Sequence, residues 1–179
     1  MKKILLLFLL ILSSAIDAQE KMMTTDGVIV FEASIPFFEA VEAKNEAVNC
    51  ILKTKKGAIT FVTYIKSFRF KRALMEEHFN ENYLESNRYP KATFKGIIEK
   101  FDLKDLGAVS KEYYIKGRMT IHGKSKNIRV IAKIKKVNKG IELKSIFSLN
   151  TDDFDIEIPF IVRSKISKKV LVSVYSNLQ

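Results

Sequence analysis

Cysteine and histidine are scarce in this sequence, and tryptophan is absent. Among 179 residues there are only one cysteine, Cys50, and two histidines. A lone cysteine excludes an intrachain disulfide, so the stability of the fold must come from packing. We expect Cys50 to be a small apolar residue of a strand, with an intermolecular bridge or a reactive thiol as the alternative.

Local motifs of catalytic and metal sites are also missing. The sequence contains no Gly-x-Ser-x-Gly and no His-x-His, and it places no histidine near Cys50. The best remaining arrangement pairs His78 or His122 with a carboxylate, for example His78 with Glu81 one helical turn later. We therefore predict no metal and no cofactor, and we keep an enzyme that uses His78 or His122 as an alternative.

Long apolar runs are rare, and the longest lies at the N-terminus. Two lysines are followed by the apolar run 4–12 and by small residues that end at Ala18. This order is typical of a secretory signal peptide, and the run is too short to span a bilayer. We predict a signal peptide at 1–18, a single domain at 19–179, and an exported protein, either periplasmic or secreted.

Alternation of apolar and polar residues dominates the rest of the chain. In "YYIKGRMTIHG", for example, Tyr113 and Ile115 share one face while Lys116 lies on the other. Short turns containing glycine, lysine and asparagine predict antiparallel hairpins, and closing eight strands into a barrel removes the unpaired edges. A barrel of this size is packed solid or holds one small ligand. The predicted strands are 28–35, 46–54, 58–70, 92–103, 112–122, 127–138, 141–151 and 168–176.

Residues 72–86 break the alternation and predict one amphipathic helix. The helix must end before Pro90, because the proline ring disfavours a helical conformation at the preceding residue, Tyr89. Leu84 is an apolar exception on the acidic side. The apolar side comprises Leu74, Met75, His78, Phe79, Asn82 and Tyr83, and the acidic side comprises Glu76, Glu77 and Glu81.

Charged residues are concentrated in two stretches, a basic one at 104–144 and an acidic one at 152–157. The full chain has a net charge of +11, and residues 104–144 hold twelve basic residues against three acids. We expect the basic residues to form the solvated outer face of the barrel, with transient docking on an anionic membrane surface as the functional alternative. Nucleic acid is not expected as a partner. The acids of 152–157 alternate with apolar residues, so we expect them to form the solvated face of an extended segment.

Phenylalanine is unusually frequent. Thirteen phenylalanines and six tyrosines are present, and many of them lie on the apolar faces of the predicted strands and helix. Core packing is the ordinary explanation for such residues. However, a solid barrel needs no additional apolar helix, whereas a hollow barrel needs a lid and an apolar lining. We expect Phe61 and Phe147 to contribute to such a lining.

Several stretches resemble the YceI-like family of exported, lipocalin-like proteins associated with polyisoprenoids. They are "SFRF" at 67–70, "LMEEHFNENYLESNRYPKATFKG" at 74–96, "IKGRMTIHGKSKNI" at 115–128 and "DFDIEIPFIV" at 153–162. The likeness extends over about 28–178. One departure is the stretch 35–48, which has no glycine where the family often turns.

The resemblance implies an all-β, eight-stranded antiparallel lipocalin-like barrel with one amphipathic helix bordering an apolar cavity. It further implies a non-catalytic protein that sequesters or carries a polyisoprenoid, an isoprenoid quinone or a similar lipid, bound as a ligand rather than a cofactor. A solid barrel that acts as an interaction module stays open, and so does a homodimer. By motif position, the implied lining residues are Phe68, Phe70, Leu74, Met75, Phe79, Tyr83, Phe94, Met119 and Ile121.

Overall fold

The computed structural model describes residues 21–179, so the predicted signal peptide lies outside the described residues. Strands make up most of the described chain, and the longest helical segment lies between β4 and β5. The strands are β1 (Lys21–Ser34), β2 (Glu42–Lys53), β3 (Ala58–Tyr64), β4 (Arg69–Phe70), β5 (Lys91–Ile98), β6 (Lys111–Ile121), β7 (Lys124–Val137), β8 (Gly140–Asn150) and β9 (Ile166–Leu178). The helical segments are η1 (Ile65–Ser67), α2 (Ala73–His78), η2 (Phe79–Tyr83), η3 (Leu103–Asp105), η4 (Thr151–Phe154) and η5 (Phe160–Val162).

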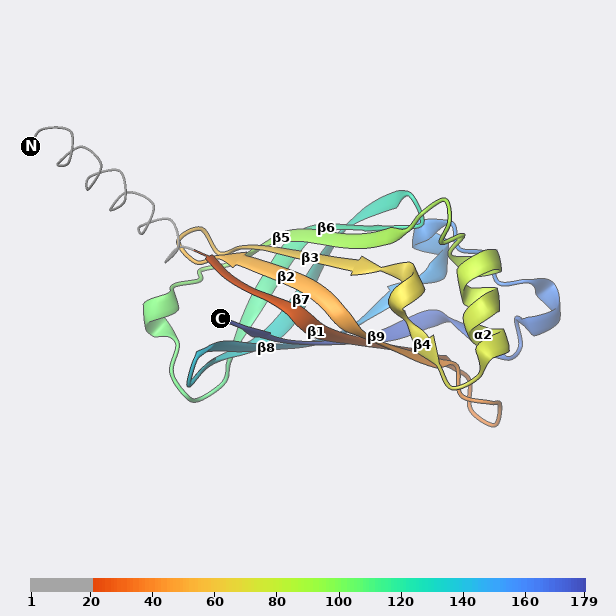
Figure 1. The fold of residues 1–179 in the computed structure, drawn as a ribbon, viewed down its shortest axis with the longest axis horizontal. Coiled ribbons are helices and arrows are strands. Elements are labelled where there is room, and N and C mark those ends of the chain that lie inside the picture. The colour runs from red at the N-terminus through yellow and green to blue at the C-terminus, as the bar shows by residue number, and fades with distance from the viewer. Residues whose placement is uncertain (1–20) are drawn as a thin grey trace, which may run out of the picture.

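The strands form one closed antiparallel barrel (Figure 1). They follow the order β1-β9-β8-β7-β6-β5-β3-β2, and β1 then pairs with β2 to close the ring, while the two-residue β4 extends from β2. This confirms the predicted eight-stranded barrel with one amphipathic helix beside it. Within residues 21–179, no helix is both long and apolar enough to cross a membrane.

The predicted strand 58–70 is wrong as a single element. β3 ends at Tyr64, because the buried Asn45 of β2 donates from Nδ2 to the Tyr64 carbonyl oxygen at 3.1 Å and to Thr63 Oγ1 at 2.8 Å. After the short turn η1, Arg69 and Phe70 form β4 opposite Lys44 and Ala43 of β2. The break carries the chain over the end of the barrel, where α2 follows (Figure 1).

The barrel is solid in one half only. Buried side chains from seven strands and from Leu106 after η3 fill the half next to η3. Phe94 belongs both to this core and to the wall of the cavity described below. Its ring lies against the paired glycines Gly96 and Gly117, where an added Cβ atom would come within 2.7 Å of the ring. Ile115 and Leu143 also belong to both sets, so Phe94 and these two residues form the floor between the filled half and the other half.

Candidate functional site

An apolar cavity of about 420 Å³ lies between the floor and the helix α2 with its continuation η2. Its wall is formed by every strand except β2, and by the connections from β1 to β2 and from β8 to β9. An apolar cavity of about 150 Å³ already stays dry and holds benzene, so this larger cavity suits an apolar ligand. Ten of the eleven predicted site residues lie in its wall: Phe61, Phe68, Phe70, Met75, Phe79, Tyr83, Phe94, Met119, Ile121 and Phe147.

Leu74 is the predicted residue that the structure does not bring to the cavity. Its side chain is 60% exposed, whereas Met75 and Phe79 reach the cavity wall. Successive residues of a helix are rotated by about 100°, so a helix that turns Met75 and Phe79 inward leaves Leu74 outside. The prediction for Leu74 is wrong because the apolar side of this helix is wider than the side that contacts the cavity.

Leu84 is a lining residue that the helical pattern placed on the acidic side. The helix continues beyond His78 as a π-helical turn, in which the backbone N–H of Leu84 donates to the carbonyl oxygen of Phe79 at 2.9 Å. This i to i−5 bond adds one residue to the turn and changes the direction of the next side chain. Leu84 is therefore buried against the cavity. A regular 3.6-residue period cannot reveal such a turn.

Four phenylalanines pack together where α2 meets the barrel. Phe79 contacts the rings of Phe31, Phe68 and Phe70, with centroid distances of 5.3, 5.7 and 5.1 Å. Phe31 in turn lies 5.4 Å from Phe68 and 5.8 Å from Phe70. Offset and edge-to-face pairs at such distances are favourable beyond their burial. The four rings join the helix to β1 and β4 and also form part of the cavity wall.

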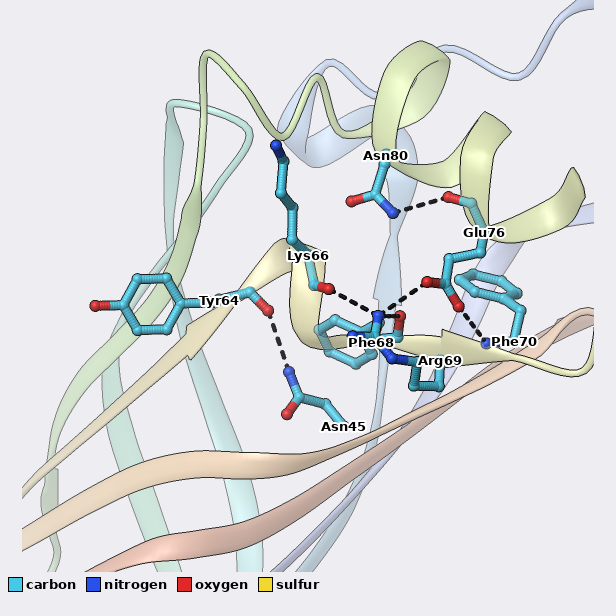
Figure 2. Close-up of polar contacts among 8 residues, drawn as sticks. All are labelled: Asn45, Tyr64, Lys66, Phe68, Arg69, Phe70, Glu76 and Asn80. Atoms are coloured by element: carbon cyan, nitrogen blue, oxygen red, sulfur yellow. Dashed lines mark hydrogen bonds and ion pairs between the residues drawn. The ribbon is translucent and has the colours of Figure 1, made fainter. Parts of the chain in front are cut away.

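Glu76 fixes the helix to β4 (Figure 2). Its Oε1 accepts from Arg69 Nη1 at 2.8 Å, and its Oε2 accepts from the backbone N–H of Phe70 at 3.2 Å. Its carbonyl oxygen accepts from Asn80 Nδ2 at 2.8 Å. Arg69 also donates to the carbonyl oxygens of Lys66 and Phe68 at 2.9 and 3.3 Å. Glu76, which the sequence placed on the acidic side of the helix, therefore binds the helix to the barrel rim.

The two histidines have different surroundings. His78 lies in the cavity wall. His122 lies outside the wall and is held at both ring nitrogens, by the Phe154 carbonyl oxygen at 3.2 Å and by Glu85 Oε1 at 2.9 Å. The hydrogen bond from His122 lowers the pKa of Glu85.

His122 and Glu85 lie within hydrogen-bond reach of each other, as the histidine and carboxylate of the alternative enzyme would have to. However, neither His122 nor Glu85 lies in the cavity wall. The position of His122 after β6, with a φ of 50°, suits a turn residue that ties the turn to Glu85 and η4. Among residues 21–179, no group of three or more histidine, cysteine, aspartate or glutamate side chains is arranged to hold a metal ion.

The acids of 152–157 differ from the predicted extended segment. Thr151–Phe154 forms the 3₁₀ helix η4, and Phe154 is buried. Asp155 pairs with Lys124 at 2.7 Å, Asp153 with Lys126, and Asp152 with Lys168 at 2.9 Å. The acids therefore link η4 and the residue after it to the start of β7 and to β9. They are solvated, as expected, but they do not alternate along a strand.

The remaining predictions concern the barrel wall. Cys50 is buried in β2, as expected of an apolar strand residue, and burial raises the pKa of its thiol. Several basic residues of 104–144 are ion-paired on the outer face of the barrel, as in Arg129 with Glu99 at 2.8 Å and Lys144 with Glu142 at 3.1 Å.

Comparison with known proteins supports a family assignment. The model of the YceI-like domain matches residues 18–178. A polyisoprenoid binding domain from Saccharophagus degradans is 15% identical with a TM-score of 0.74, covering 89% of this chain and 98% of its own. Burkholderia cenocepacia BcnA is 16% identical with a TM-score of 0.67, covering 84% of this chain and 94% of its own.

The YCEI protein of Campylobacter jejuni is 19% identical with a TM-score of 0.54, covering 86% of this chain and 85% of its own. At these identities the structural likeness supports the fold alone. No curated protein sequence matches the chain significantly.

Proposed function

The chain belongs to the YceI-like domain family, and from this we propose that it is a non-catalytic protein that binds one long apolar amphiphile, such as a polyisoprenoid or an isoprenoid quinone. The observation that carries the proposal is the cavity of about 420 Å³, enclosed by phenylalanine and aliphatic side chains above a filled barrel half. A similar fold occurs in a polyisoprenoid binding domain.

Apolar burial alone supplies enough free energy for such binding. A lipid chain that buries on the order of 400 Å² gains about 10 kcal/mol at roughly 25 cal/mol per Å². Ordering the lipid and losing its free motion reduce this gain substantially. We expect the length and the shape of the cavity to set the selectivity, so several lipids should compete for it.

Native mass spectrometry of gently purified protein tests the proposal, together with uptake of a long-chain isoprenoid probe. We expect a co-purifying lipid, released chemically unchanged, and stoichiometric uptake of the probe by protein stripped of lipid. An empty protein that also takes up no probe contradicts the proposal. A probe that is chemically converted during incubation would favour the enzyme alternative.

A pair of variants on the same helix connects the result to the cavity. Phe79→Asp places a carboxylate in the apolar wall, and we expect loss of lipid retention because an unpaired charge in such surroundings is costly. Leu74→Asp introduces the same charge at an exposed position of α2 outside the wall, and we expect retention to be unchanged. Equal retention by two folded variants would contradict the proposed site.

We further propose that the protein is exported. The support is the signal-peptide pattern that ends at Ala18. Mass determination of protein from the native host's exported fraction should give a chain that begins at residue 19. A full-length chain in the cytoplasmic fraction alone would contradict export.

A further inference from the structure

Two loops at the α2 end of the barrel carry a repeated four-residue pattern. The first, Ile35-Pro36-Phe37-Phe38, lies between β1 and β2, and the second, Ile158-Pro159-Phe160-Ile161, lies between η4 and β9. Ser34 at the end of β1 pairs with Ile166 at the start of β9. The two loops therefore leave the rim from neighbouring strands, at the right of Figure 1. We call 35–38 and 158–165 the rim loops.

The rim loops turn apolar side chains in two directions. Phe38, Ile158 and Val162 line the cavity. Phe37 is wholly exposed, and Phe160 and Ile161 are 83% and 86% exposed. Large apolar residues that protrude beside a ligand cavity are not needed to pack the barrel. Their exposure needs another explanation.

The backbone conformation of Phe37 also indicates that its exposure is not explained by folding. Phe37 has a φ of 71°, a conformation that is unfavourable for a bulky residue. The turn around it is closed by the N–H of Phe38, which donates to the carbonyl oxygen of Ile35 at 3.2 Å. Glycine or asparagine would suit this position better, and the exposed ring makes no compensating contact with the core. Such residues cluster at functional sites.

Positive charge accompanies the exposed apolar residues. Arg163 and Lys165 follow them, Lys165 borders the cavity, and neither has an ion-pair partner within residues 21–179. Glu39, the acid that follows the first loop, is paired with Arg72. Glu157, which precedes the second loop, is an exposed acid. Arg163 Nε donates to the Ile158 carbonyl oxygen at 2.9 Å, which holds the guanidinium beside the second loop. The rim loops thus combine apolar tips with cations that no carboxylate within residues 21–179 neutralises.

From these observations we propose that the rim loops dock the cavity end of the protein onto a lipid bilayer with anionic headgroups. Phe37, Phe160 and Ile161 enter the apolar boundary, while Arg163 and Lys165 meet the lipid phosphates. Single protruding side chains on two separate loops suit a fluid apolar layer better than a shaped groove on another protein. Glu77 of α2 and Glu81 of η2 are exposed, and their negative charge disfavours contact of the helix with anionic headgroups.

This placement differs from the docking region suggested by the sequence. The basic residues of 104–144 lie on the barrel wall, where several are engaged with carboxylates, including Lys133 with Glu112 at 3.7 Å and Lys135 with Glu142 at 3.4 Å. Ile146 on β8 is 67% exposed and lies on this wall, one residue after the pair formed by Ala132 and Ser145. It therefore provides a matched control.

Co-sedimentation with vesicles tests the proposal. The probe is a vesicle of phosphatidylglycerol and phosphatidylcholine in about equal amounts, without isoprenoid. We expect the double variant Phe160→Ser, Ile161→Ser to bind at least roughly tenfold more weakly, because two large apolar side chains are lost. Ile146→Ser on the wall should bind like the unaltered protein. So should Val109→Ser, which removes a side chain that is 79% exposed in the loop after η3.

Phe37→Asn separates docking from folding. Asparagine tolerates the left-handed conformation, so we expect thermal stability to be unchanged or higher while vesicle binding falls. A loss of stability instead of binding would show that Phe37 serves the fold. The proposal is overturned if the unaltered protein ignores the vesicles, if the rim-loop variants bind normally, or if Ile146→Ser weakens binding as much as they do.

The outcome is independent of the proposed lipid binding, because the vesicles contain no isoprenoid. A protein that retains isoprenoid but ignores vesicles overturns docking alone. A protein that binds vesicles but takes up no isoprenoid overturns the carrier function alone.

Discussion

Phe79 offers the most direct test of how α2 is oriented. Its ring contacts three other rings at 5.1 to 5.7 Å. Each such pair contributes about 1 kcal/mol. Replacing a buried phenylalanine by alanine costs about 3–5 kcal/mol, and Phe79 belongs at the lower end because it borders an open cavity. We expect Phe79→Ala to lower the free energy of unfolding by about 3 kcal/mol.

Leu74→Ala is the control, because it shortens an exposed side chain one turn earlier in the same helix. Its expected cost is below about 0.5 kcal/mol. For a domain of this size, the Phe79 change corresponds to a decrease in Tm of roughly 6–12 °C. Because tryptophan is absent, urea unfolding of lipid-free protein is best followed by circular dichroism. Equal destabilisation by the two variants would refute the inward orientation of Phe79.

Three further predictions concern the barrel and its η4 end. Gly117→Ala should destabilise the fold by more than about 2 kcal/mol, because its Cβ would lie 2.4 Å from the Lys95 carbonyl oxygen. Gly107→Ala is the control, because its added Cβ would have no atom within 4 Å. Equal urea midpoints for the two variants would count against the tight packing at the floor. Cys50 should resist a thiol reagent until urea unfolds the protein, because burial removes access and raises the pKa of the thiol; rapid labelling of folded protein would contradict this. Glu85→Gln should lower Tm at pH 7, and the difference from the unaltered protein should vanish as the pH falls below about 4. The sign follows from the lowered pKa of Glu85 in the folded state, since such a carboxylate stabilises only while it is ionised; a difference independent of pH would refute this role of the bond to His122.

The period of two was sufficient to predict the barrel, because each strand has one dry and one wet face. It failed where the backbone leaves the regular pleat. β1 begins at Lys21 rather than near residue 28, and its pairing with β2 shifts register between Thr24 and Gly27. A bulge of this kind interrupts the alternation on which the prediction depends.

The residue types of the site were predictable from the sequence, but the directions in which their side chains point were not. Phe94 shows the difficulty, because the same side chain serves the solid core and the cavity wall. Sequence alone does not separate these roles, since core and lining need the same residue types. The π-helical turn before Leu84 and the positive φ of Phe37 are tertiary features that a propensity or a period cannot reveal.

Phe94 and the packed half of the barrel close the cavity at its inner end. A ligand that enters from the α2 end must also leave at that end, so binding and release use the same opening. A ligand longer than the cavity leaves its last segment outside, where only an adjoining surface can shield that segment from water. The depth of Phe94 below the rim therefore limits the length of lipid chain that the cavity can enclose.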